Sequence, residues 1–459
     1  MGDRDSDTVR GIRQLCDWAA CVELRDIPHA VLQRGARVLV DDLAAIIGAR
    51  DEPEVAAFHA SLLERAAREE ATLFCGGRRR IDCLSAAVGN GTAGDFLELD
   101  EGYRVAPCHA GLYIVPALLA TAEFGNLVLG DLLRALVVAY EIVTRVARTW
   151  PPRVMNLHSH ARYSAVGAAA ATALAGRTSA DLLHRALTAA ATLVNNGPRN
   201  HLVSGALVRN VWPAVGAWSG MMSVEWARCG IGGSPQGFDD VYTGLLGSEA
   251  QPQHLLGDLG GRWAVLDGYL KIHACCQHLH STVEATLDLR SRVIAGGGME
   301  RIERIDVAAH PLALLLPNAH PATTLGAKFS LPHAVAAALL TGSGGAHAFA
   351  SSTLDDPAIA RLRERVTMAP YGKTLAPPND RPARVSVHLS GGQVVDAECL
   401  SAQGGADRPF PPEVFVEKIA ELTSPVYPRY VAVSSELLRL DPGPMQQGWR
   451  DIVGDLCAG

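Results

Sequence analysis

The 459-residue chain has few aromatic and few charged residues. Aromatic residues make up 5% of it and charged residues 19%, whereas 48% of the chain is apolar. Because so few large rings are available, we expect aliphatic side chains and alanine to fill the core. A chain of this length is long enough for two domains, each with a sizeable core.

Signals of several protein classes are missing. The ten cysteines show no CxxC pair and no regular spacing, which argues against a disulfide framework. The net charge is −7 and the longest basic run is Arg78-Arg79-Arg80, interpreted as a solvated turn, so nucleic-acid binding is not expected. Phosphate-loop, GxSxG and dinucleotide-binding motifs do not occur either.

Targeting and membrane signals are also missing. Residues 1–11 are polar and acidic, unlike a secretory signal peptide. The apolar stretch 112–138 is interrupted by four polar residues, Glu123, Asn126, Asp131 and Arg134. This pattern favours two buried helices over a membrane span, and we expect a cytoplasmic protein without membrane contact.

Helical periodicity dominates the first half of the chain. It predicts helices over residues 24–47, 53–67, 114–123, 129–149, 165–175 and 180–194. Residues 178–181 have capping-box spacing before the last of these helices. Alanine runs at 168–171 and 189–191 would let neighbouring helices approach closely.

The pattern changes after about Leu266. Residues 301–308 alternate like a strand, and residues 384–399 predict a hairpin that turns at Gly391-Gly392. Helices are expected between them, over 331–341 and 357–366, and again in the tail from 411 to 456. The sequence therefore predicts a small α+β unit inserted between helical segments.

Residues 88–117 hold the densest group of chemically active side chains. Glu98, Asp100 and Glu101 precede a Gly-Tyr-Arg turn, and His109 then opens a long apolar run. Neighbouring charges and partial burial push pKa values toward neutrality, so such a cluster suits proton transfer. A solvated acidic loop that caps the next helix has the same pattern, and spacing alone leaves both interpretations open.

Six blocks spread over roughly residues 41–340 resemble, in the same order, the 2-methylcitrate dehydratase and cis-aconitate decarboxylase family, MmgE/PrpD. The blocks are residues 88–117, 139–145, His158 with 166–171, 205–220, Lys271 with Cys275, Cys276 and His280, and 327–333. The resemblance implies a mainly α fold. A large all-helical domain would come from residues 1–266 and 403–459, and a smaller inserted α+β lid domain from residues 267–402. The site would lie in the crevice between them.

The resemblance also implies the site residues. Candidates for catalysis are His109, His158, Lys271, Asp100 and His333. Candidates for substrate binding are Glu98, Glu101, Arg104, Arg209 and Cys276. Lysine and arginine can hold carboxylates, and histidine can move protons.

Three positions depart from the family's decarboxylases, which carry Lys at Arg209, His at Cys276 and Tyr at His333. Arginine stays charged at all accessible pH values, which favours carboxylate binding over proton transfer. Histidine in place of tyrosine lowers the ordinary pKa from about 10 to about 6.5. Decarboxylation is therefore not the first choice.

Residues 273–280 contain three histidines and two cysteines, which are ligands that zinc prefers. Adjacent cysteines and a His-x-His gap do not reproduce structural-zinc spacings. The resemblance implies a family that works without metal, so we expect neither a metal nor another cofactor.

The expected function is a cofactor-independent lyase that acts on a small anionic di- or tricarboxylate, with dehydratase-type proton abstraction and elimination. One alternative is an epimerase of an iminodisuccinate-like dicarboxylate, which would use two opposed bases. Another is a non-catalytic protein that binds an anionic metabolite or serves as a scaffold. The resemblance and the alanine-rich helices also predict a homodimer.

Overall fold

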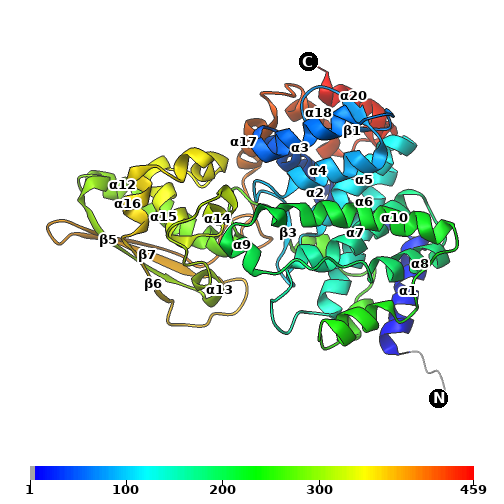
Figure 1. The fold of residues 1–459 in the computed structure, drawn as a ribbon, viewed down its shortest axis with the longest axis horizontal. Coiled ribbons are helices and arrows are strands. Elements are labelled where there is room, and N and C mark those ends of the chain that lie inside the picture. Colours follow the sequence, from blue (N-terminus) through cyan, green and yellow to red (C-terminus); the bar gives the residue numbers. More distant parts are fainter. Residues whose placement is uncertain (1–5, 459) are drawn as a thin grey trace.

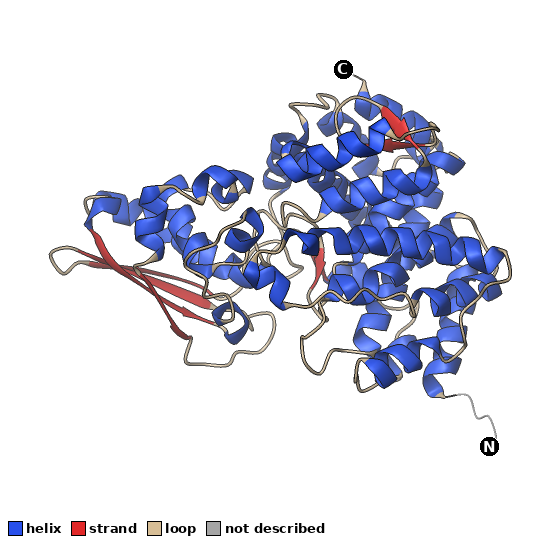
Figure 2. Cartoon of the chain, viewed as in Figure 1, coloured by secondary structure: helices blue, strands red, loops and turns tan. Residues whose placement is uncertain are grey.

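The computed structural model describes residues 6–458 and has two parts (Figure 1). The larger part is a helical bundle built from both ends of the chain, and the smaller part carries a four-stranded sheet (Figure 2). The mainly α fold with a smaller α+β part, predicted from the sequence, is confirmed. None of the helices within residues 6–458 is both long and apolar enough to cross a membrane.

The helices of the larger part come from two stretches of chain. The first contributes α1 (Asp7–Cys21), α2 (His29–Gly48), α3 (Pro53–Glu64), α4 (Cys83–Gly94), α5 (Ala110–Gly125), α6 (Leu129–Thr149), α7 (Ser159–Ala175), α8 (Ala180–Ala190), α9 (Asn200–Ser204), α10 (Trp212–Arg228) and α11 (Gln253–Leu256). The second contributes α17 (Pro412–Thr423), α18 (Tyr430–Arg439), α19 (Pro442–Gln446) and α20 (Trp449–Cys457). Two short antiparallel pairs join β1 (Ala71–Leu73) to β2 (Arg79–Ile81), and β3 (Gly102–Tyr103) to β4 (Gly268–Tyr269).

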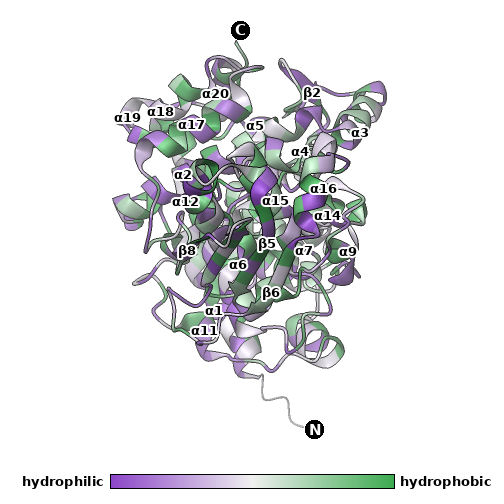
Figure 3. Cartoon of the chain, turned by 90° about the vertical axis from the view of Figure 1, so that its left-hand side faces the viewer, coloured by the Kyte–Doolittle hydropathy of each residue, from purple (hydrophilic) through white to green (hydrophobic). Residues whose placement is uncertain are grey.

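Helix α7 lies at the centre of the larger part. All of its residues are buried, and α5, α6, α8 and α10 pack around it. From Ala165 to Ala175 its side chains are small or apolar on every face, and such a helix needs neighbours on every face. Viewed from the side of the smaller part, apolar segments gather toward the middle of the molecule, as at α6 and β5 (Figure 3).

Glycines set the distance between α7 and α10. A Cβ atom at Gly220 would lie 2.6 Å from both the carbonyl oxygen of Ala165 and the Cβ of Ala168. At Gly216 it would meet the side chain of Ser164 even more closely. The two backbones are therefore in contact at positions where only glycine fits.

The smaller part, which we call the lid, contains the sheet with strand order β6-β5-β7-β8. These strands are β5 (Ile302–Ala309), β6 (Val366–Pro370), β7 (Ala383–Leu389) and β8 (Val394–Cys399), and only the β5–β6 pair is parallel. Helices α12 (His280–Ala295), α15 (Leu331–Thr341) and α16 (Pro357–Arg363) pack together, with α12 against β7 and β8. In β7 and β8 buried residues alternate with more exposed ones, which is typical of a sheet covered on one face. Two short helices, α13 (Pro311–Leu314) and α14 (Thr324–Lys328), complete the lid.

Several predicted boundaries were wrong. The helix expected over 24–47 begins only at His29, after Pro28, because a residue before proline disfavours the helical conformation. The helix expected from 165 already begins at Ser159. The helix expected over 357–366 ends at Arg363, and Val366 opens β6.

Two smaller predictions also differ from the structure: the turn at the arginine run 78–80 and the capping box over residues 178–181. Arg78 and Arg79 are exposed, as predicted, but the run is not a turn: Arg79 and Arg80 belong to β2, and Arg80 Nε lies 3.3 Å from the buried carboxylate of Glu123. The N-cap of α8 is Ser179, whose hydroxyl accepts a hydrogen bond from the Leu182 N–H.

We predict that Gly220→Ala destabilises the protein, because the added methyl group meets backbone atoms that cannot move aside. Overpacking of this kind costs about 1–3 kcal/mol. The matched control is Gly244→Ala at an exposed position of the helical turn Asp239–Leu245, where the nearest atom to the added carbon is the Asp239 carbonyl oxygen at 3.7 Å, an ordinary contact distance. Urea unfolding should show a lower midpoint for Gly220→Ala than for the control, and equal midpoints would contradict the close packing of α7 and α10.

Candidate active site

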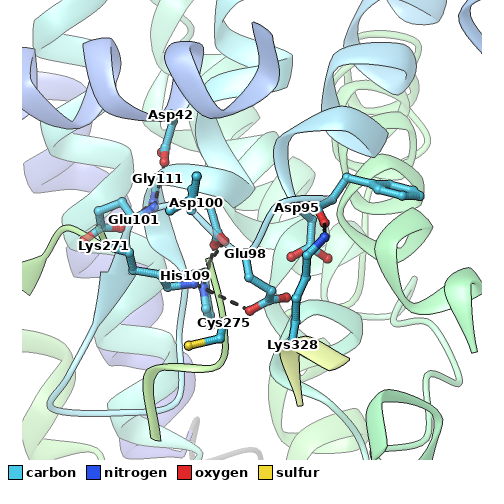
Figure 4. Close-up of polar contacts among 12 residues, drawn as sticks. Asp42, Asp95, Glu98, Asp100, Glu101, His109, Gly111, Lys271, Cys275 and Lys328 are labelled. Atoms are coloured by element: carbon cyan, nitrogen blue, oxygen red, sulfur yellow. Dashed lines mark hydrogen bonds and ion pairs between the residues drawn. The ribbon is translucent and has the colours of Figure 1, made fainter. Parts of the chain in front are cut away.

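The loop between α4 and α5 brings acidic side chains into the interior. Asp95, Glu98, Asp100 and Glu101 are each at most 1% exposed. Buried carboxylates are stable only with partners that compensate their charge or satisfy their oxygens. Figure 4 shows that these partners come from several other segments of the chain.

His109, Asp100 and Lys271 form a chain of contacts. The Nδ1 atom of His109 lies 2.6 Å from Asp100 Oδ2, and Lys271 Nζ donates to Asp100 Oδ1 at 3.1 Å. Burial by itself would raise the pKa of Asp100, but the charges of Lys271 and His109 outweigh burial and hold that pKa below its ordinary value. An ionised Asp100 keeps a proton on Nδ1 of His109, so Nε2 is the ring nitrogen left for the cavity.

Local structure explains how these three side chains meet. His109 is the residue before the first turn of α5, at the end of the acidic loop. Lys271 is the second residue after the β4 segment, which pairs with β3 in that same loop. The short β3–β4 pair therefore holds Lys271 beside Asp100, although 171 residues separate them in sequence.

Arg209, in the short 3₁₀ helix Leu207–Val211, pairs with two other carboxylates. Its Nη1 atom lies 2.6 Å from Asp95 Oδ1 and also pairs with Glu98. Burial alone would lower the pKa of Arg209, but the charges of Asp95 and Glu98 raise it above its ordinary value. The guanidinium also lies over the ring of Phe329 from the lid, 5.1 Å from its centre.

Three histidine rings form a row. The ring centre of His160 lies 4.3 Å from that of His158 and 4.7 Å from that of His109. His158 is the N-cap of α7, and its Nδ1 accepts a hydrogen bond from the His160 backbone N–H at 3.3 Å. Burial lowers the pKa of both His158 and His160 well below the ordinary value, and neighbouring cations lower it further. Both rings are therefore neutral near pH 7.

His160 was not among the predicted site residues. It is fully buried, its Nδ1 lies 2.9 Å from the Tyr113 hydroxyl, and its Nε2 lies 3.2 Å from Asp95 Oδ1. The available signal was the His-x-His spacing at a helix start, where both side chains can reach the preceding loop. Asp95 was also missed: it lies within residues 88–117, but three residues before the acidic run Glu98–Glu101.

A cavity of about 480 Å³ opens beside this cluster, between the helical part and the lid. Its volume is in the range typical of small-molecule sites, about 300–1,000 Å³. The polar wall of the helical part is formed by Glu98, His109, His158 and Arg209. The lid contributes Cys276, Gln277, His278, Phe329 and Arg381.

Six of the ten predicted site residues line this cavity: Glu98, Arg104, His109, His158, Arg209 and Cys276. Asp100 and Lys271 lie behind His109 and do not line the cavity. Glu101 does not line the cavity either. Its carboxylate accepts hydrogen bonds from the Gly111 N–H at 3.1 Å and from the Tyr140 hydroxyl at 2.5 Å.

His333 does not join the cluster. It lies in α15, and its Nε2 is 3.3 Å from the carbonyl oxygen of Ala348 and 3.4 Å from the Thr353 hydroxyl. Burial lowers its pKa to about 4. All these partners belong to the lid, so the structure places His333 among packing contacts and away from the cavity.

Arginines surround the cavity. Arg104 lines it but is engaged with the loop before β7, donating to Asp380 at 2.8 Å and to the carbonyl oxygen of Pro378 at 2.5 Å. Arg199 and Arg381 also line the cavity, and neither was predicted. Each stands alone in a loop, where no local pattern distinguishes it from a surface arginine.

The cysteines and histidines of residues 273–280 lie in different surroundings. Cys276 lines the cavity, and burial raises the pKa of its thiol to about 11, so the thiol is neutral near pH 7. His273 and His280 pack edge to face, with ring centres 5.2 Å apart. Within residues 6–458 no three His, Cys, Asp or Glu side chains are grouped so as to hold a metal ion.

Comparison with known proteins gives consistent matches over most of the chain. The model of the MmgE/PrpD N-terminal domain matches residues 13–249, and that of the MmgE/PrpD C-terminal domain matches residues 273–438. The chain is 27% identical to the cis-aconitate decarboxylase-like protein oryM of Aspergillus oryzae, with 90% of each chain covered. It is 24% identical to a cis-aconitate decarboxylase of Aspergillus terreus, with 92% of this chain and 91% of the relative covered.

The buried Glu101 predicts a pH dependence of stability. Burial raises the pKa of Glu101 from 4.5 to about 7 in the folded protein. Its stabilising contribution is fully present below pH 4.5 and is lost as the pH rises through 7, because the unfolded chain releases the proton first. The free energy of unfolding should therefore fall by roughly 3 kcal/mol over this window on account of Glu101.

Glu101→Gln removes this titration. Relative to wild type, the variant should gain stability between pH 4.5 and pH 7.5, as measured by urea unfolding at each pH. Glu436→Gln, at an exposed position of α18, is the control and should follow the wild-type curve. Parallel curves for wild type and Glu101→Gln would contradict the raised pKa.

Proposed function

The chain belongs to the MmgE/PrpD family, and we propose that it is a cofactor-independent lyase. Its substrate would be a small di- or tricarboxylate, and its reaction a dehydratase-type proton abstraction followed by elimination. The relatives support lyase-type chemistry at the level of the family. The finer proposal rests on the residues around the cavity.

The observation that carries the proposal is the Lys271–Asp100–His109 chain that ends at the cavity. Asp100 holds Nδ1 of His109 as the donor, so Nε2 is free to accept a proton from a carbon next to a substrate carboxylate. The imidazolium that forms is stabilised by Asp100, which stays ionised beside Lys271. General base catalysis by a histidine held in this way contributes about 10²–10⁴ to the rate.

His158 supports the reaction in a different way. Its Nδ1 already accepts a hydrogen bond, so in the neutral ring the hydrogen is on Nε2. The ring lines the cavity, where it can donate a hydrogen bond to a substrate carboxylate or to the departing hydroxyl. Arg199 and Arg381 add positive charge to the cavity wall, which favours a polyanionic substrate.

Epimerisation is the second candidate. His278 lines the cavity from the lid and His109 lines it from the helical part, so a substrate between them would have an imidazole on each side. An epimerase needs two such groups, one to remove the proton and one to return it to the opposite face.

A substrate panel separates these reactions. The protein is incubated in D₂O with analogues of citrate, methylcitrate, aconitate, tartrate and iminodisuccinate, and the reaction is followed by proton NMR. We expect it to convert a member of this panel into an alkene by loss of water, or to add water to an alkene of the panel. Stereochemical scrambling with deuterium uptake and no alkene would favour the epimerase. Loss of carbon dioxide, or no reaction with any member of the panel, would overturn the dehydratase proposal.

Substitutions test the roles within the chain of contacts. His109→Ala and Asp100→Asn should each lower kcat by about 10²–10⁴, because one removes the base and the other its orientation. Lys271→Ala should instead destabilise the fold by about 3–5 kcal/mol, since it leaves buried carboxylates without their cation.

The matched control is His333→Ala, which removes a buried histidine that does not line the cavity. Its loss should lower the melting temperature while turnover per folded molecule is unchanged. Turnover and melting temperature are measured on the same preparations. A fully active Asp100→Asn enzyme would contradict the assigned proton transfer.

A further inference from the structure

The cavity has a polar base and an apolar mouth. The base residues Glu98, His109, His158 and Arg209 are only 1–8% exposed. At the mouth, four large apolar side chains that line the same cavity are much more exposed: Val105 56%, Val154 66%, Leu312 41% and Leu315 51%. The exposed fraction thus separates a buried polar base from an entrance formed mainly by hydrocarbon, where Asn156 is also exposed; the arginines Arg104, Arg199 and Arg381 are partly exposed and line the wall between the two.

Both parts of the molecule contribute to this apolar mouth. Val105 lies in the loop before His109, and Val154 in the loop before His158. Leu312 lies in α13 of the lid and Leu315 directly follows that helix. Figure 1 places the lid beside the helical part, with α9 and α14 at the junction, and these two helices are in contact.

Further apolar residues continue the surface inward from the mouth. They are Ala106, Met155 and Leu202, which are buried or partly buried, while Pro107 is exposed and belongs to the mouth itself. Single exposed apolar side chains are ordinary on a protein surface, whereas a contiguous group around one opening marks a binding site. Substrate carboxylates held by His158, Arg199 and Arg381 would not use this surface.

We propose that the apolar mouth is a subsite for a hydrocarbon substituent, so that the substrate is a polycarboxylate that carries an alkyl chain. The inference rests on the proposed function, which supplies the carboxylates bound at the base. The cavity of about 480 Å³ is large enough for a chain-bearing acid. The continuity of the mouth with the buried base favours a substituent of the substrate over a separate partner protein.

Binding of a homologous series tests the subsite. The probes are succinate, butylsuccinate and octylsuccinate, titrated into the wild-type protein by calorimetry. Each buried methylene should lower Kd by about fourfold, the factor that corresponds to roughly 0.8 kcal/mol per methylene. Equal Kd values across the series would overturn the inference.

Substitution at the mouth localises the effect. The double variant Leu312→Ser/Leu315→Ser should show a clearly smaller change in Kd per methylene than wild type. Val394→Ser is the matched control: Val394 is 50% exposed on β8 of the lid and does not line the cavity. This control should keep the full dependence on chain length. An unchanged dependence in the double variant would overturn the assignment to α13.

Two further results separate this inference from the proposed function. If Kd falls with chain length but no substrate of the panel reacts, the subsite stands and the proposed lyase activity fails. If small polycarboxylates react and chain length has no effect, the subsite alone fails. The apolar mouth could instead be covered by a second copy of this chain, and sedimentation of the double variant tests this. If the wild-type protein is a dimer and the double variant is a monomer, the mouth is a dimer interface and the subsite is overturned.

Discussion

Charge compensation of the buried acidic loop is the constraint on which the site depends. Asp95, Glu98 and Asp100 are withdrawn from water together, and uncompensated they would repel one another and resist burial. Arg209 and Lys271 supply the compensating charges from separate segments of the chain. Because these two segments lie far from the loop in sequence, the compensation of its charge exists only in the folded chain.

Backbone and side-chain contacts of the acidic loop also join the lid to the helical part. Gly102 and Tyr103 pair with Gly268 and Tyr269 just before Lys271, and Lys328 of the lid donates to the carbonyl oxygen of Phe96 in the acidic loop at 2.7 Å. Each link places a lid segment against the loop that carries His109. The cavity is therefore bounded by two parts whose relative position is set at the base, next to the reactive side chains.

The surroundings of each carboxylate and histidine give chemically similar groups different pKa values. Asp100 has a lowered pKa because Lys271 and His109 outweigh its burial, whereas burial raises the pKa of Asp95 to about 6 and of Glu101 to about 7. His158 and His160 are neutral because they are buried next to cations. These differences leave His109 oriented by an ionised carboxylate beside the cavity, and the proposed proton abstraction relies on that arrangement.

The sequence by itself determined the class of fold and the acidic segment of the site. Periodicity predicted α6 with the bounds that the structure has, and it identified the hairpin of β7 and β8, because these patterns are local. The family resemblance added residues such as His158 and Arg209, but the grouping of Asp95, His160, Arg199 and Arg381 with them was decided by tertiary structure alone. Asp95 and His160 meet across 65 residues, Arg199 and Arg381 reach one cavity from different parts, and His333 is kept away from it. Such distances depend on how helices pack over long separations in sequence, and no local pattern of residue types encodes them.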